Sequence, residues 1–238
     1  MRTANPVFRN LEKQDTFAVD QTASYQGIIL KTATLLLIAI VSGYLAITQF
    51  TSILIPLLFT SMIVAFISVL VSTLVPRLAM PFGILYALSE GVLLGTITAI
   101  FNDAYPGIAL TAVLATAAIF TVMLFLYSSG AIRVTSRFRR IMTSLLLGFL
   151  VFFVIFGILS LFGTFDGVST TFMLIISAVF IVYGAFMLTI DFDNAQRIVE
   201  GQADKTYEWV VAVGLMVTLV WIYIELLRLL AILTSRRN

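Results

Sequence analysis

The residues best placed to do chemistry in this sequence are acidic side chains inside or at the ends of long apolar stretches. They are Glu90, Asp191, Asp193 and Glu225. A charge inside a bilayer costs about 2.5–3.5 kcal/mol on insertion scales, so an ionisable residue there is a functional candidate by default. A carboxyl group in such a place can exchange a proton or offer oxygen ligands to a hard cation such as calcium. The chemistry indicated is proton binding and cation passage.

Two of these acids fall well inside their apolar stretches. Glu90 lies near the middle of one, where the plainer alternative is a protonated acid bonded to a neighbouring carbonyl. Glu225 shares a helical stripe with Thr218 and Arg228, and its plainer alternative is an internal pair with Arg228 at i,i+3. We expect Glu90, Glu225 and Thr218 to line a polar path through the protein.

The two aspartates close an apolar stretch, so we expect them at the end of a helix. Asp191 and Asp193 are two residues apart and point to nearly opposite sides of that helix. An acid at a helix C-terminus opposes the helix dipole, so a cationic partner is expected. Asp193 precedes Arg197 by four residues, the order that favours an ordinary surface pair. The sharper prediction is that Arg77, at the same membrane depth, is the counter-ion of Asp193 or Asp191, with snorkelling of Arg77 as its alternative.

The composition places nearly all of the chain in a membrane. Of its 238 residues, 61% are hydrophobic and 11% charged, against about 45–50% and 25% in a soluble domain. The absence of Cys and His excludes disulfides, thiolate catalysis and histidine-bound zinc. With no phosphate-binding loop or protease motif, we expect no catalytic residue, cofactor or resident metal, and no nucleic-acid partner. The bilayer is the expected partner.

Hydropathy predicts an all-α, polytopic bundle with about seven spans. We divide the chain into a cytoplasmic tail at 1–31 and one transmembrane domain at 32–238. The predicted spans are 32–50, 52–75, 81–101, 108–127, 141–162, 168–190 and 209–233. Six spans with a re-entrant last segment are the alternative, since Arg236 and Arg237 argue mildly against an outer C-terminus.

The basic residues predict the orientation. With the N-terminus inside, eleven of the fourteen Lys and Arg fall on the inner side, while the loops at Asp103 and Asp166 have none. Cytoplasmic loops carry this excess of positive charge. The sequence therefore predicts a cytoplasmic N-terminus, and the cluster from Arg133 to Arg140 acts as an anchor that also suits anionic lipid.

Several short segments resemble the Bax-inhibitor family, also called the transmembrane BAX inhibitor motif or YccA-like family. They are residues 193–200 (DNAQRIVE), 207–209 (YEW), 226–230 (LLRLL) and, as in a bacterial branch, 5–10 (NPVFRN). The resemblance implies a central last helix wrapped by two layers of three helices. It also implies a pH-sensitive calcium leak in which two carboxylates, one from each of the last two helices, share a proton and pair with an Arg of the second helix.

Carried onto this sequence, the resemblance makes Asp193, or Asp191, the first carboxylate and Arg77 the latch. The position of the second carboxylate falls near Thr218, which is not an acid, and Glu225 lies two turns farther along. The function expected is a pH-sensitive calcium or other cation leak in a bacterial cytoplasmic membrane. One alternative is a non-conducting regulator that binds a membrane protease or another membrane protein through the tail at 1–20; a weaker one is a proton-coupled transporter.

Overall fold

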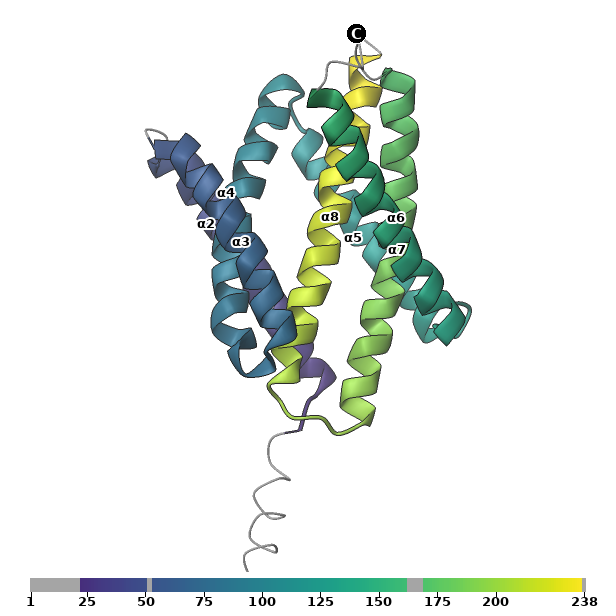
Figure 1. Cartoon of the computed structure of the whole chain (residues 1–238). Coiled ribbons are helices and arrows are strands. Elements are labelled where there is room, and N and C mark those ends of the chain that lie inside the picture. Colours follow the sequence, from purple (N-terminus) through teal and green to yellow (C-terminus); the bar gives the residue numbers. More distant parts are fainter. Residues whose placement is uncertain (1–21, 51–52, 162–168, 237–238) are drawn as a thin grey trace, which may run out of the picture.

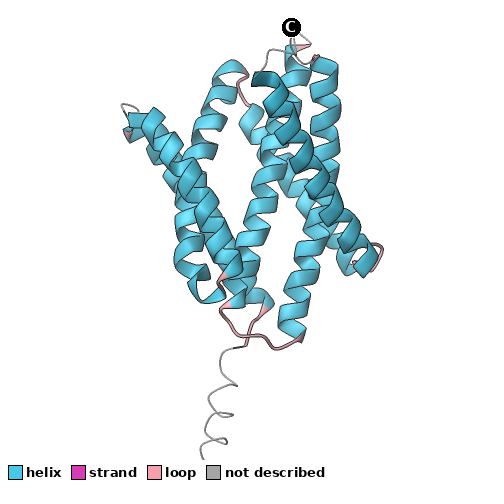
Figure 2. Ribbon diagram, in the orientation of Figure 1, coloured by secondary structure: helices cyan, strands magenta, loops and turns pink. Residues whose placement is uncertain are grey.

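In the part of the chain that the structure describes, seven long α-helices run up and down along one bundle (Figure 1). The structure is a computed structural model that describes residues 22–50, 53–161 and 169–236. The helices are α2 (Tyr25–Gln49), α3 (Leu54–Leu74), α4 (Ala79–Ala104), α5 (Ile108–Ser128), α6 (Ser136–Leu161), α7 (Thr170–Glu200) and α8 (Tyr207–Ser235), with one 3₁₀ turn, η2 (Pro76–Leu78), before α4. Figure 2 shows helices and loops and no strand in the described part of the chain. The one pairing of extended residues there is a bridge between Thr22 and Asp204.

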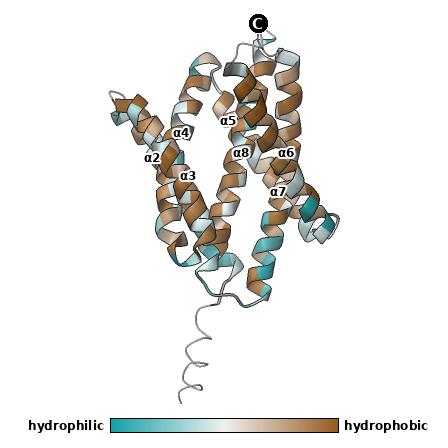
Figure 3. Cartoon of the chain, viewed as in Figure 1, coloured by the Kyte–Doolittle hydropathy of each residue, from teal (hydrophilic) through white to brown (hydrophobic). Residues whose placement is uncertain are grey.

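All seven helices are long and apolar enough to cross a membrane. The shortest, α3 and α5, have 21 residues each, or about 31 Å at 1.5 Å per residue, which matches the hydrocarbon core of a bilayer. Apolar residues cover most of each helix and polar residues gather toward the ends (Figure 3). The predicted all-α, multi-pass bundle is confirmed. Helix α8 has 29 residues and runs the length of the bundle, so it is not a short re-entrant segment.

Helix α7 does not end where the aspartates begin. It continues to Glu200, so Asp191 and Asp193 lie within the helix, and the expected helix end at these residues is wrong. Two i,i+4 contacts support the added turns: Arg197 binds Asp193, and Gln196 donates to Glu200. The aspartates are therefore held on a regular helix, where their directions are fixed.

The last helix occupies the centre of the bundle. In its most apolar stretch 61% of α8 is buried, against 6% of α6. Helices α2, α3 and α4 lie on one side of α8, and α5, α6 and α7 lie on the other (Figure 1). This is the arrangement of two sets of three that the resemblance implies. Helix α6 packs against α7 and remains at the periphery.

One end of the bundle is basic. Helices α2 and α8 begin at this end, and η2 and the connections from α5 to α6 and from α7 to α8 lie there as well (Figure 1). We call it the basic end because it holds Lys31, Arg77, Arg133, Arg137, Arg139, Arg140, Arg197 and Lys205. Asp103 and the end of α8 lie at the opposite end.

Glycines let α2 and α4 touch backbone to backbone. A Cβ atom added to Gly95 would lie 2.6 Å from the Cα atom of Gly43, and one added to Gly43 would lie 2.6 Å from the carbonyl oxygen of Gly91. Membrane helices associate through such small residues because lipid gives them no hydrophobic driving force. The pairing of α2 with α4 therefore depends on these three positions.

We predict that Gly95→Ala destabilises the protein by about 2 kcal/mol, because the new methyl group overpacks a backbone contact. The matched change is Gly148→Ala on α6, where an added Cβ meets nothing within 4 Å; it should leave stability unchanged or slightly higher, since Ala favours helix over Gly. Unfolding in a mixed-detergent titration measures both. Equal effects of the two changes would contradict the close approach.

Candidate functional site

Asp191 of α7 is a buried carboxyl that faces α8. It is 8% exposed, and its Oδ2 atom accepts a hydrogen bond of 2.6 Å from the Thr218 hydroxyl, itself 8% exposed. Gly214, one turn before Thr218, leaves room for the carboxyl: an added Cβ would lie 3.8 Å from Asp191 Oδ1. The resemblance places a second carboxylate near Thr218. Thr218 does lie opposite the Asp191 carboxylate, and it supplies a hydroxyl in place of an acid.

Asp193 is at the centre of a network at the basic end. It forms ion pairs with Arg139 of α6 and with Arg197, whose Nε atom lies 2.6 Å from Asp193 Oδ2. Arg139 also donates to Asn194 Oδ1 at 2.8 Å. The Tyr127 hydroxyl of α5 lies 3.5 Å from Asp193 Oδ1 and donates to Gln196 at 2.5 Å. The network thus joins α5, α6 and α7, and the two aspartates have different surroundings despite their closeness in sequence.

The expected pairing of Arg77 with an aspartate is not present. Arg77 lies in the exposed η2 turn before α4 and forms no hydrogen bond or ion pair with the residues that the structure describes. The cation beside the aspartates comes instead from α6, because α6 packs on α7 whereas η2 contacts α3, α4 and α8. In this conformation Arg139 occupies the place that we predicted for Arg77.

Glu90 and Glu225 line one small pocket. Its volume is about 280 Å³, and it lies where α4 meets α8, with Tyr86 and Trp221 among its walls. Glu225 is paired with Arg228 at 3.0 Å, as the i,i+3 spacing predicted. Glu90 is half-buried and has neither hydrogen bond nor ion pair within the described part of the chain. Two membrane-embedded carboxyls thus converge on one space, and Thr218, the third residue that we expected on a polar path, is not among its walls.

An aromatic cluster lies beside both acidic sites. Trp221 falls between Thr218 and Glu225 on α8, and its ring packs 5.8 Å from those of Phe180 and Tyr183 of α7. Thr218 and Glu225 are seven residues apart, or about 10 Å along the helix. The carboxyls are therefore arranged as two sites along α8, which we call the acidic stations: Asp191 with Thr218, and Glu90 with Glu225. Trp221, a bulky aromatic residue, lies between them. Each station offers the oxygen ligands that a hard cation prefers; no three acidic residues of the described ranges form a metal cluster.

Three features of these sites were not predicted from the sequence: Arg139 as the partner of Asp193, the contact of Tyr127, and a further buried acid, Glu208. Glu208 is fully buried in the first turn of α8, where it pairs with Lys31 and accepts a hydrogen bond of 2.7 Å from the Ser24 backbone. The position of Glu208 at the start of a predicted helix was the available signal, because helix N-termini favour acids. That signal could not identify Lys31 as the partner of Glu208, because Lys31 is 177 residues away in the chain.

Comparison with known families agrees with this architecture. A family model described as "Bax inhibitor 1 like" matches residues 5–235. The chain belongs to the Bax inhibitor 1 like family. A search of curated proteins gives no match. The family match covers all seven helices of the bundle, so the earlier resemblance, made from a few short segments, is confirmed.

We predict that Arg139→Gln loosens α6 from α7, since it removes the ion pair and the bond to Asn194 and leaves Asp193 with Arg197 alone. The cost is about 1–2 kcal/mol for a partly exposed charged network. The matched change is Arg140→Gln, because Arg140 is exposed and forms no such contact. Amide hydrogen exchange in the first turns of α6 should rise for Arg139→Gln only; identical exchange in the two variants would contradict the assignment.

Proposed function

We propose that this family member is a pH-sensitive leak channel for a cation, with calcium as the first candidate. The observation that carries the proposal is the Asp191 carboxyl, buried between two central helices and held by the Thr218 hydroxyl. Purely structural polar groups in a membrane are satisfied by neutral hydrogen bonds. An acid in that position adds the ability to change charge, which a structural role does not need.

The proposed trigger is loss of the Asp191 proton. As pH rises, the carboxyl becomes negative in a space where one hydroxyl is its only hydrogen-bond partner among the described residues. A buried charge needs a cation or additional donors. Arg139 is bound to Asp193, two residues from Asp191 on the same helix. The new charge would draw Arg139 away from Asp193 or admit a cation, and either event changes the contact between α6 and α7.

The proposed path continues to the pocket lined by Glu90 and Glu225. The unpaired carboxyl of Glu90 is available to a passing ion, whereas Glu225 is partly neutralised by Arg228. Trp221, between the two stations, would have to move for an ion to pass, which suits a leak that is normally closed. In this proposal Asp191 replaces Asp193 as the primary sensor, and Arg139 replaces Arg77 as the latch.

The basic end gives the proposed orientation. Short basic loops remain on the cytoplasmic side of membranes, so the start of α2 would face the cytoplasm and the end of α8 the outside. We propose the cytoplasmic membrane of a bacterium as the location. The tail at 1–20, on which the regulator hypothesis depends, lies outside the described residues, so the structure adds no observation in favour of that function.

The first test is calcium flux into dye-loaded liposomes from pH 5 to pH 8. Wild-type flux should rise with pH, because ionisation creates the negative charge that attracts the ion. Asp191→Asn should make the flux independent of pH, since the amide cannot ionise. Asp193→Asn is the matched control and should keep a pH-dependent flux. If Asp193→Asn, and not Asp191→Asn, removes the pH dependence of the flux, our choice of sensor is wrong. If neither the wild type nor any variant conducts calcium, the channel proposal is refuted.

The path is tested separately by Glu90→Gln. At the alkaline end of the range, where the carboxyl is ionised, loss of the Glu90 charge should reduce the flux roughly tenfold, the effect of losing about 1.4 kcal/mol of attraction for the ion. The difference from wild type should shrink toward the acid end, because a protonated carboxyl is as neutral as the amide. Glu200→Gln, at the exposed end of α7, is the control with the same chemical change. A Glu90→Gln flux equal to that of the control would remove Glu90 from the path.

A further inference from the structure

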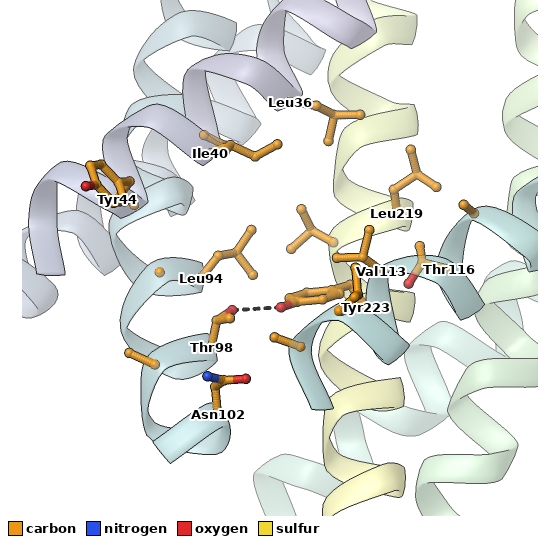
Figure 4. A pocket seen from close by; sticks show the side chains of 18 of the residues that line it. Leu36, Ile40, Tyr44, Leu94, Thr98, Asn102, Val113, Thr116, Leu219 and Tyr223 are labelled. Carbon is orange, nitrogen blue, oxygen red and sulfur yellow. Dashed lines mark hydrogen bonds between the residues drawn. The ribbon is translucent and has the colours of Figure 1, made fainter. Parts of the chain in front are cut away.

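A large apolar cleft, separate from the acidic stations, lies between α2, α4, α5 and α8 (Figure 4). Its volume is about 890 Å³, near the upper end of the range of about 300–1,000 Å³ that is usual for ligand pockets. Its walls reach from the middle of the bundle to Asp103, at the end opposite the basic end. It includes none of Asp191, Asp193, Glu90 and Glu225.

The threonine hydroxyls in the walls, and the hydroxyl of Tyr223, are already bonded within the protein. The hydroxyls of Thr98 and Tyr223 bind each other at 2.8 Å (Figure 4). Thr116 and Thr121 each donate to a carbonyl of their own helix at 2.8 Å. A buried water or a bare ion needs several polar partners, and this cleft leaves few open. The remaining walls are aliphatic and aromatic, which suits a hydrocarbon chain.

The cleft is accessible from the bilayer. Ile40 of α2 and Leu110 of α5 both line it, and they are 68% and 65% exposed. Its inner wall, in contrast, is the central helix α8, where Val220 is only 6% exposed. A lipid chain that enters between α2 and α5 would therefore reach a helix that lipid at the outer surface cannot touch.

The mouth of the cleft carries an acid and no base. Asp103 lies at the end of α4 and is exposed, and no Lys or Arg is among the residues that line the cleft. At the membrane surface an unpaired carboxylate favours a cationic group over an anionic one. A headgroup that contains an ammonium ion fits this mouth.

We propose that this cleft binds one membrane phospholipid, with an acyl chain against α8 and an ammonium headgroup, as in phosphatidylethanolamine, at Asp103. The occupant is a lipid because the walls are mostly apolar, their threonine hydroxyls are bonded within the protein and the opening faces the bilayer. Lipid binding at this cleft does not require cation conduction, so it is tested separately from the proposed function.

The test uses the full chain in phosphatidylglycerol vesicles, whose lipid has no ammonium group, with a small fraction of phosphatidylethanolamine that carries a photoactivatable diazirine on one acyl chain. After illumination, mass spectrometry should find labelled peptides at Leu219–Tyr223 of α8, in the inner wall. Ala117→Trp fills the cleft and should reduce that labelling at least fivefold. Ala118→Trp is the matched control, because Ala118 is its exposed neighbour and does not line the cleft. In Ala118→Trp the labelling of α8 should equal that in wild type.

If Ala117→Trp does not fold, two measurements on folded protein still test lipid binding in the cleft. Excess unlabelled lysophosphatidylethanolamine should suppress labelling of α8 in wild type and leave surface labelling of α6 unchanged. A phosphatidylglycerol probe, or Asp103→Asn with the ethanolamine probe, should label α8 several-fold less. Absence of α8 labelling, labelling that competitor does not reduce, or equal labelling by both headgroups would overturn the proposal.

Discussion

The hydrogen bond from Thr218 to Asp191 joins the two helices on which the rest of the structure depends. Inside a bilayer a carboxyl cannot rely on water, so each one must be placed against a donor, a cation or a cavity. Asp191 has a hydroxyl, Asp193 has two arginines, Glu208 has Lys31 and Glu225 has Arg228. Glu90 alone of these faces a pocket without a bonded partner in the described chain. The placement of these acids decides which helices must touch.

The architecture follows from that requirement. Helix α8 provides Thr218, Glu208 and Glu225, and it is the most buried helix. Helix α7 brings Asp191 to it, and α2 brings Lys31. Helix α6 is held mainly from the side of α7, through Arg139 and aromatic contacts such as Phe149 with Phe180. A change of charge at Asp191 would therefore act where the central helix meets α7, the helix that holds α6.

Local patterns in the sequence predicted part of this arrangement. The seven apolar stretches predicted seven helices because span length follows directly from bilayer thickness. The pair of Glu225 and Arg228 followed from i,i+3 spacing. Thr218 was expected at the position of a second carboxylate, and the structure does place it against Asp191.

The parts that could not be predicted depend on which helices become neighbours. Arg77 and Arg139 lie at the same end of the bundle, and only the packing of α6 against α7 selects Arg139 as the partner of Asp193. The continuation of α7 past Asp193 could not be read from hydropathy, because its last turns are polar and are supported by side-chain pairs. The cleft between α2, α4, α5 and α8 is formed mostly by residues that are ordinary apolar positions in the sequence.

The central claim is that a protonation change at Asp191 controls conduction. Infrared difference spectroscopy of the reconstituted protein measures that protonation directly, through the carbonyl stretch of the neutral acid, assigned by its loss in Asp191→Asn. Our account predicts that this band disappears over the same pH interval in which ion flux increases. A band that stays constant, or is absent, throughout the interval in which flux changes would contradict it.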